Sequence, residues 1–277
     1  MTPPPSPKNS APNPGSPPPC TRFSLENGAV WLSLAGGTEP DPGLLAAGLE
    51  RRGQRDGGGW VPLGSSGERA WVKGGRLSWK SSLRHGASRA FLGRPVPRLR
   101  EMGNLLELIR RAVPAAEPLL AGVERGPIGR PTMQFLATRE VRDAVEITTY
   151  LSTATGDQRL GVLASAGALA SQMHRAGFVH RNFFARNLVR QPDGVLTILD
   201  PWRGEFVHRP RCHVVDLAGF LADAGRALAD RDRRCFLESY AHASEGAFDI
   251  PKAAALQAAT DQEARRMEVR VQRRRGR

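Results

Sequence analysis

Cysteine is scarce in this sequence, and its placement excludes two common ways of stabilising a fold. The three cysteines, Cys20, Cys212 and Cys235, are far apart and form no paired-ligand pattern. An odd, scattered set does not predict a disulfide framework or a structural zinc site. His208 and His213 flank Cys212, but no fourth ligand is evident nearby, so the sequence does not favour a metal centre there.

Long apolar runs are also lacking. No uninterrupted stretch approaches the roughly 20 apolar residues that cross a bilayer, and the first residues, rich in proline and serine, contain no apolar block of the signal-peptide kind. We therefore expect the protein to be cytoplasmic, and the alternative is a peripheral position at the inner face of the membrane. At 277 residues and 40% hydrophobic content, the chain is long enough for one large domain or two packed lobes.

Lysine occurs only four times, at Lys8, Lys73, Lys80 and Lys252, so arginine supplies nearly all of the formal charge of +13. A basic surplus of this size favours anionic partners: nucleic acid, a phospholipid surface or a phosphorylated glycolipid. Arginine-rich composition is equally typical of genomic base bias. Nucleic acid is the least favoured partner, because no aromatic interleaving and no known binding module is present.

Hydrophobic periodicity and turn residues predict alternating strands and helices from Glu68 onward. Before that point, residues 23–59 contain only short apolar pieces interrupted by glycine and proline, which indicates weak strands and loops. The expected strands are 68–73, 132–138, 187–190 and 195–199. The expected helices are 100–113, 158–177, 214–228, 232–243 and 252–277.

The most informative pattern lies in the second half of the chain. His180-Arg181-Asn182 is followed by Asn187, and Asp200 comes at the end of an apolar strand. This spacing is typical of a kinase catalytic loop followed by a metal-binding strand. An amide oxygen from Asn187 and a carboxylate from Asp200 would both suit Mg²⁺.

Two residues upstream complete the pattern. Lys73 lies on an expected strand and Glu101 opens the next expected helix, an order typical of the lysine–glutamate pair that holds nucleotide phosphates. A glycine-rich phosphate loop is less clear. Gly64-Ser65-Ser66-Gly67 is the candidate, and a plain hairpin turn is the equal alternative.

Segments throughout this region resemble the lipopolysaccharide kinase family, which phosphorylates Kdo or heptose. The run from His174 to Leu188 is similar to the family's catalytic segment, Trp71-Val72-Lys73 to its lysine strand, and Arg100-Glu101-Met102-Gly103-Asn104-Leu105 to its glutamate helix. Val113 to Leu119 resembles the link that follows, and Asp216-Leu217-Ala218 the helix start whose aspartate braces the catalytic loop. The resemblance spans about residues 71–246.

The resemblance implies an α+β, bilobal protein-kinase-like fold with a small antiparallel β N-lobe and a mainly helical C-lobe. We expect a disordered proline-rich tail (1–22), the N-lobe (23–142) with one helix, the C-lobe (143–260) and a basic tail (261–277). It further implies ATP and Mg²⁺ as cofactors and an anionic sugar or glycolipid as acceptor. Lys73 and Glu101 would bind the nucleotide, Asn187 and Asp200 the metal. The catalytic candidates are Asn182, His180 and Arg181, with His180 expected to brace the loop, and Asp216 would give structural support.

Asn182 is the main departure from the family, whose members have an aspartate there. An amide cannot take a proton as a general base does, a role that contributes about 10²–10⁴-fold. Two hypotheses follow: a working sugar kinase in which Asn182 aligns the hydroxyl, and a pseudokinase that binds nucleotide or a partner but transfers little phosphate. Asp200-Pro201-Trp202 is a second departure, although a carboxylate remains.

The C-terminal arginines, Arg265, Arg266, Arg270 and Arg273 to Arg275, form a candidate contact for an anionic membrane. A merely solvated tail is the alternative.

Overall fold

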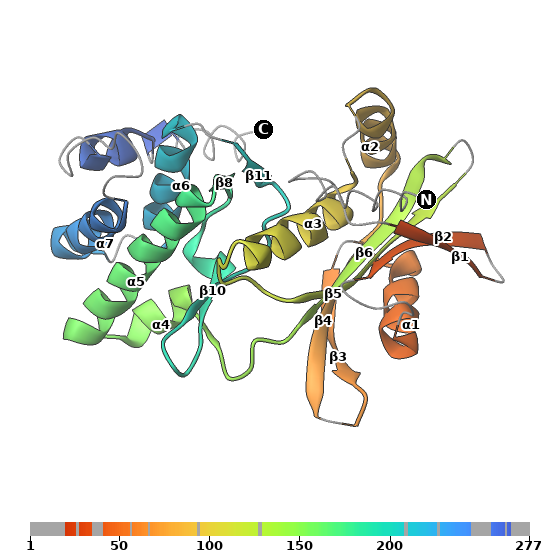
Figure 1. Ribbon diagram of the computed structural model, residues 1–277, viewed down its shortest axis with the longest axis horizontal. Coiled ribbons are helices and arrows are strands. Elements are labelled where there is room, and N and C mark those ends of the chain that lie inside the picture. The colour runs from red at the N-terminus through yellow and green to blue at the C-terminus, as the bar shows by residue number, and fades with distance from the viewer. Residues whose placement is uncertain are drawn as a thin grey trace, which may run out of the picture.

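The computed structural model describes residues 20–25, 28–34, 41–55, 57–65, 67–92, 95–126, 129–207, 210–225, 228–244, 256–263 and 265–266. They form two lobes, one built on a twisted sheet and one mainly helical, which lie side by side in Figure 1. This arrangement confirms the expected α+β, bilobal fold. Residues 1–19 of the expected tail lie outside the described part.

The N-lobe is built on a six-stranded antiparallel sheet in the order β1-β2-β5-β6-β4-β3. Its strands are β1 (Cys20–Leu25), β2 (Gly28–Leu34), β3 (Gly57–Leu63), β4 (Glu68–Arg76), β5 (Pro118–Arg125) and β6 (Pro131–Arg139). The first strand begins inside the segment expected to be a disordered tail, since residues 20–22 pair with β2.

Three helices accompany this sheet, α1 (Pro42–Glu50), α2 (Trp79–Leu92) and α3 (Pro97–Arg110), so the expectation of one N-lobe helix was wrong. The first is followed by the short η1 (Arg51–Gly53). Asp41 caps α1, accepting a hydrogen bond from the Leu44 backbone N–H at 2.9 Å, and Pro42 occupies the first turn. Asp-Pro is a helix-start signal, but the glycines around it obscured the helical period.

The third helix begins and ends three residues before the predicted span of 100–113. Pro97 lies in its first turn, where a missing N–H costs nothing, and Ala112, at a φ of 58°, follows its end. Leu105 and Leu108 are buried in the interior, whereas Ile109 is 42% exposed. The helix therefore presents Glu101, on the same side as its buried residues, to the sheet.

The C-lobe packs around α5 (Gly156–Arg175) and α7 (Asp230–Ala243). Its other helical elements are α4 (Ile147–Thr153), η3 (Ala185–Asn187) and α6 (Pro210–Asp223), and its short strands are β7 (Val145–Glu146), β8 (Phe178–Val179), β9 (Leu188–Arg190), β10 (Leu196–Ile198) and β11 (Glu205–Phe206). The predicted hairpin is confirmed as β9 and β10. Gly177, at a φ of 79°, follows the last turn of α5 and is the predicted helix stop.

Close helix packing in this lobe depends on a glycine. A Cβ on Gly167 of α5 would come within 2.3 Å of the Phe236 carbonyl oxygen of α7. Within the described residues, no helix combines the length and apolarity that a bilayer crossing requires. Of the predicted basic tail, Arg265 and Arg266 are described, and Arg266 pairs with Glu263 at 3.3 Å. Arg270 and Arg273 to Arg275 lie outside the described residues.

Candidate active site

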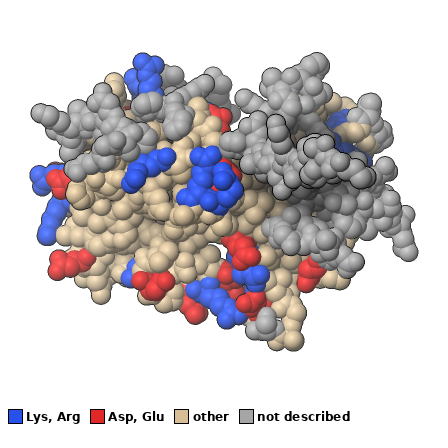
Figure 2. Space-filling view, viewed as in Figure 1, with Lys and Arg blue, Asp and Glu red and all other residues tan. Residues whose placement is uncertain are grey.

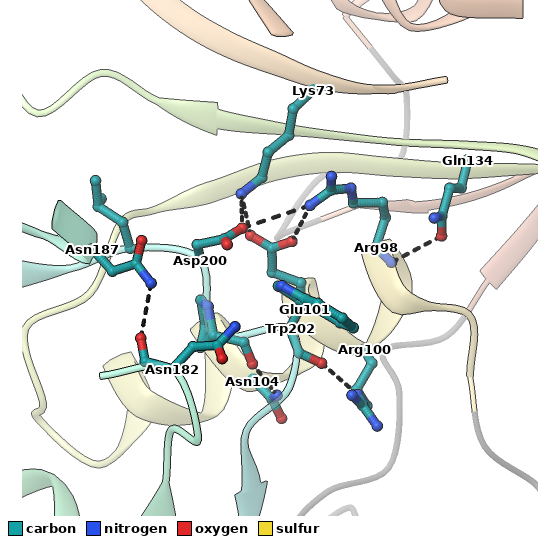
Figure 3. A network of polar contacts seen from close by, with 12 residues as sticks. Lys73, Arg98, Arg100, Glu101, Asn104, Gln134, Asn182, Asn187, Asp200 and Trp202 are labelled. Carbon is teal, nitrogen blue, oxygen red and sulfur yellow. Dashed lines mark hydrogen bonds and ion pairs between the residues drawn. The ribbon is translucent and has the colours of Figure 1, made fainter. Parts of the chain in front are cut away.

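Lys73 lies at the meeting point of the two lobes. Its Nζ is 2.5 Å from Oε1 of Glu101 and 2.6 Å from Oδ1 of Asp200. These residues come from β4, from α3 and from the segment that follows β10, and Figure 3 shows the three side chains converging. The structure thus brings together three groups that are distant in sequence and were singled out from their order alone.

Glu101 is fully buried, so its charge needs more than one partner. Arg98, one turn earlier on α3, provides the second cation: its Nη1 lies 2.8 Å from Oε2 of Glu101 and 3.6 Å from Oδ1 of Asp200. Removing one member of a buried ion pair leaves an uncompensated charge and is strongly destabilising. The two cations therefore fix Glu101, and Glu101 fixes the direction of Lys73.

Asn187 faces the same cavity as Asp200. Its Nδ2 donates a hydrogen bond to the Asn182 carbonyl at 2.8 Å, which leaves the side-chain oxygen to face the cavity. A carboxylate and an amide oxygen are the hard donors that Mg²⁺ prefers. The donor set at Asp200 and Asn187 therefore fits the cation implied by the resemblance.

The catalytic loop is held in a strained shape by one buried carboxylate. Asp216 accepts hydrogen bonds from the backbone N–H groups of His180 at 2.7 Å and Arg181 at 2.6 Å. Arg181 has a φ of 63°, a left-handed conformation that costs a non-glycine residue about 1–3 kcal/mol. Two charge-assisted hydrogen bonds offset that cost, so Asp216 is placed as the predicted support would require.

His180 and Arg181 contact the protein rather than the cavity. The fully buried His180 ring donates from Nε2 to the Leu199 carbonyl at 3.0 Å, and burial lowers the pKa of this histidine, which keeps the ring neutral. The Arg181 guanidinium pairs with Glu205. Neither residue lines the cavity around Lys73. His180 thus contacts the backbone next to Asp200, and Arg181 contacts Glu205 rather than the cavity.

Asn182 follows this braced pair and is half-buried. Its backbone carbonyl accepts hydrogen bonds from Asn187 and from the Phe184 N–H. Its side-chain amide makes no hydrogen bond within the described part of the chain, and Figure 3 shows the residue beside Asn187. Asn182 does not line the cavity around Lys73.

A cavity of about 580 Å³ surrounds these groups, within the size range of small-molecule sites. Trp60 and Trp71 line it from the sheet, with ring centroids 5.0 Å apart in an edge-to-face arrangement. The segment linking the lobes contributes Glu140, Val141 and Ala144. Aromatic rings and charged groups therefore line one cavity, a combination that suits a ligand with a base and a phosphate chain.

Gly64 and Gly67 of the candidate glycine loop lie between the paired strands β3 and β4, as the hairpin alternative expects. Gly67 is six residues before Lys73, about 20 Å along an extended strand, and neither glycine lines the cavity around Lys73. The glycine opposite Lys73 in the antiparallel pair of β3 and β4 is Gly58. A Cβ on Gly58 would lie 2.3 Å from the Trp71 ring, so the packing of that ring already requires a glycine there.

Helix α3 also holds the backbone that follows Asp200, a feature that sequence reasoning missed. Asn104 Nδ2 donates to the carbonyls of Pro201 at 2.7 Å and Gly204 at 3.1 Å, and Arg100 Nε donates to the Trp202 carbonyl at 2.7 Å. The i, i+3 spacing of Arg98, Glu101 and Asn104 places them on one helix face, and it was the available signal. These hydrogen bonds fix the backbone of the unusual residues that follow Asp200.

Of the alternative metal set, Cys212 and His213 lie within the described residues. His213 stacks on His174 with ring centroids 4.0 Å apart, and His208 lies outside the described residues. Among the residues that the structure describes, no group of three or more His, Cys, Asp or Glu side chains gathers as metal ligands would.

Two lobes of this construction, with a lysine paired to a glutamate within the N-lobe and to an aspartate of the C-lobe, define a protein of the kinase-like class. The chain belongs to the lipopolysaccharide kinase (Kdo/WaaP) family, whose model matches residues 63–240. Family membership identifies it as a sugar-kinase-like phosphotransferase, and a kinase takes its phosphoryl group from ATP. No curated protein matches the chain in sequence.

A solved structure supports the fold assignment. A structure described as WaaP in complex with acyl carrier protein is similar with a TM-score of 0.56 and 18% identity, covering 85% of this chain and 98% of that one. The BubR1 kinase domain is similar with a TM-score of 0.43 and 10% identity, covering 87% and 81%. At these identities the likeness concerns the fold alone.

Proposed function

We propose that the chain transfers the terminal phosphoryl group of ATP to a hydroxyl of an anionic sugar or glycolipid, with Asn182 at the position of the usual aspartate. The observation that carries this proposal is the convergence of Glu101 and Asp200 on Lys73, beside a cavity that Asn187 also lines. A cation, an anion and two oxygen donors at one end of a small-molecule cavity suit a nucleotide with its metal.

Each group has a distinct task in this account. Lys73 neutralises phosphate charge, and Glu101 and Arg98 hold its side chain in place. Asp200 and Asn187 would hold Mg²⁺, which when bound neutralises charge on the phosphates. His180 and Arg181 are positioning residues, and Asp216 fixes the loop that carries Asn182. The N-lobe (23–142) and C-lobe (143–260) close on the nucleotide between them.

Asn182 orients the acceptor without removing its proton. In the transfer, the bond between the terminal phosphorus and the oxygen of ADP breaks, and a bond to the sugar oxygen forms. An amide can hydrogen-bond the hydroxyl but cannot accept its proton, so the proton leaves to a phosphate oxygen or to water. Positioning and charge neutralisation supply most of the catalysis of phosphoryl transfer, so a slower rate remains.

A pseudokinase is the second candidate, and Asn182 is the observation that favours it. In that case the cleft binds nucleotide, and binding rather than transfer carries the function. The two candidates share every feature of the nucleotide site and differ only in the fate of the phosphoryl group.

Turnover and nucleotide binding, measured together, separate the two candidates. We would measure ATP consumption and the thermal shift induced by Mg²⁺-ATP on the natural chain, on Asn182→Asp and on Asp200→Asn. The proposal expects slow turnover by the natural chain, a rate at least about 10²-fold higher for Asn182→Asp, and none for Asp200→Asn. A clear shift without turnover in both of the first two proteins would replace the kinase by the binding module.

Location at a membrane is a separate part of the proposal. We propose that the C-terminal arginines, among them Arg265 and Arg266, contact anionic lipid. Binding to vesicles that contain an anionic phospholipid should weaken with salt and disappear when the residues after Glu263 are deleted. Binding that survives the deletion would end this part of the proposal and leave the kinase assignment intact.

A further inference from the structure

A second cavity opens beside the nucleotide site. It has a volume of about 940 Å³ and lies between α2, the start of α3 and the ends of β4 and β6. Among the described residues, Asp200 alone lines both cavities. In Figure 3, Asn187 lies on one side of Asp200 and Arg98, which lines the second cavity, on the other.

The charge of the second cavity is one-sided. Five arginines line it, and Asp200 is the one acidic residue among its described lining residues. That carboxylate is already engaged by Lys73 at 2.6 Å. The arginines are Arg55, Arg76, Arg84, Arg98 and Arg130.

Three of these arginines, Arg55, Arg76 and Arg84, form no ion pair within the described part of the chain, although carboxylates pair with arginines elsewhere on the surface. On the face shown in Figure 2, blue and red side chains lie close together rather than segregated. Guanidinium groups that line one cavity repel one another, and an anion between them would relieve that repulsion. The cavity therefore has the electrostatics of an anion site.

Arg130 is held ready for such a ligand. Its guanidinium carbon lies 3.8 Å from the centroid of the Trp79 ring, and its Nε is buried without a hydrogen-bond partner in the described residues. Stacking fixes the plane of the guanidinium, and a buried donor without a partner is unfavourable. A ligand oxygen would satisfy that donor.

His85 also lines the second cavity, and its pKa reflects both its burial and the positive charge of neighbouring arginines. Burial lowers its pKa, and the charges of Arg84 and Arg100 lower it further. An anion in the cavity would oppose those charges.

We propose that this cavity binds the anionic group of the acceptor, a phosphate or a carboxylate on a sugar, while the nucleotide lies on the other side of Asp200. Guanidinium groups match the oxygens of both anions in bidentate geometry. The volume exceeds that of the nucleotide cavity and admits a sugar. The proposal rests on the proposed function, and it implies that a reaction adding the acidic group to the sugar precedes this one.

The test measures binding without turnover. Glucose 6-phosphate, glucuronate and glucose are titrated into the full-length protein by calorimetry at low salt, with and without saturating Mg²⁺-ADP. We expect one or both anionic sugars to bind and glucose not to bind, with affinity retained when Mg²⁺-ADP is present. Comparison of the phosphate and carboxylate arms identifies the preferred group.

Paired substitutions locate the binding. Arg84→Gln/Arg130→Gln should weaken binding at least about tenfold, and so should Arg76→Gln/Arg84→Gln, which changes exposed side chains only and spares the fold. Arg231→Gln, an exposed arginine on α7, is the matched control for loss of charge and should change affinity less than twofold.

Three results would overturn the proposal: no binding of either anionic sugar, an equal loss in Arg231→Gln, or displacement of the sugar by Mg²⁺-ADP. The last would assign the arginines to nucleotide phosphates. Failure of the proposed function gives a different result: the protein would bind the anionic sugar but would neither bind nor consume Mg²⁺-ATP. The cavity would then be a sugar site without a role as an acceptor site.

Discussion

Asn104 Nδ2 lies 2.7 Å from the carbonyl oxygen of Pro201, and this hydrogen bond joins α3 to the residue after Asp200. The same amide reaches the Gly204 carbonyl at 3.1 Å. Because Glu101 lies on the same helix, the position of α3 fixes both Lys73 and the backbone that carries Asp200. The lysine, the glutamate and the aspartate therefore form one connected unit.

Asn104→Ala should disrupt that unit. Two carbonyls lose a buried donor, which should cost about 1–3 kcal/mol of unfolding free energy and weaken Mg²⁺-ATP binding. Chemical denaturation and nucleotide titration measure the two effects. The control is Gln172→Ala, which removes an exposed hydrogen bond to the Ala112 carbonyl and should change stability by less than about 0.5 kcal/mol. Equal effects of the two substitutions would contradict the coupling.

Gly58→Ala should destabilise the N-lobe, because the added Cβ would lie 2.3–2.8 Å from atoms of the Trp71 indole. Overpacking of this kind costs about 1–3 kcal/mol. Gly161→Ala on α5 has the opposite expected sign: nothing lies within 4 Å of its Cβ, and alanine in a helix stabilises by about 0.4–1 kcal/mol. Thermal unfolding compares them. A neutral Gly58→Ala would show that the Trp71 ring moves freely.

Asp216→Asn should release the catalytic loop. An asparagine keeps one acceptor oxygen but loses a charge-assisted hydrogen bond, which should cost about 2–3 kcal/mol, and transfer should slow at least tenfold as Arg181 leaves its strained conformation. Asp193→Asn, in an exposed turn, is the isosteric control. Activity that survives Asp216→Asn unchanged would show that the loop keeps its shape without this brace.

The buried His180 predicts a definite sign for the pH dependence of stability. Its pKa is lowered by burial, so below the ordinary pKa of about 6.5 the unfolded chain binds more protons than the folded one. Unfolding free energy should therefore fall as pH drops below about 6.5, by up to about 1.4 kcal/mol per unit for one group. His85 acts in the same direction.

Denaturation curves between pH 7 and 5 test this slope. His180→Gln should lower stability at pH 7 but flatten the slope. A slope that is identical in the natural chain and in the variant would assign the pH dependence to other groups.

The order and spacing of Lys73, Glu101, Asn187 and Asp200 were sufficient to predict that they lie close together. An apolar strand, a helix and a hairpin in that order can pack together in only a few ways. The family resemblance supplied the bilobal fold. Local patterns failed where the interaction is between elements: nothing near Gly58 in the sequence shows that Trp71 packs on it, and Asp41-Pro42 is too short a signal among glycines. The arginines that line the second cavity come from five separate segments of the chain, so no local sequence pattern predicts this cavity.

Magnesium-dependent ATP binding tests the central claim most directly, by calorimetry on the natural chain, on Lys73→Met and on Lys80→Met. Lys80 is an exposed lysine of α2 outside both cavities. The account predicts that the natural chain and Lys80→Met bind Mg²⁺-ATP alike, and that Lys73→Met binds at least about tenfold more weakly. No binding by the natural chain, or an equal loss in both variants, would contradict a nucleotide site at Lys73.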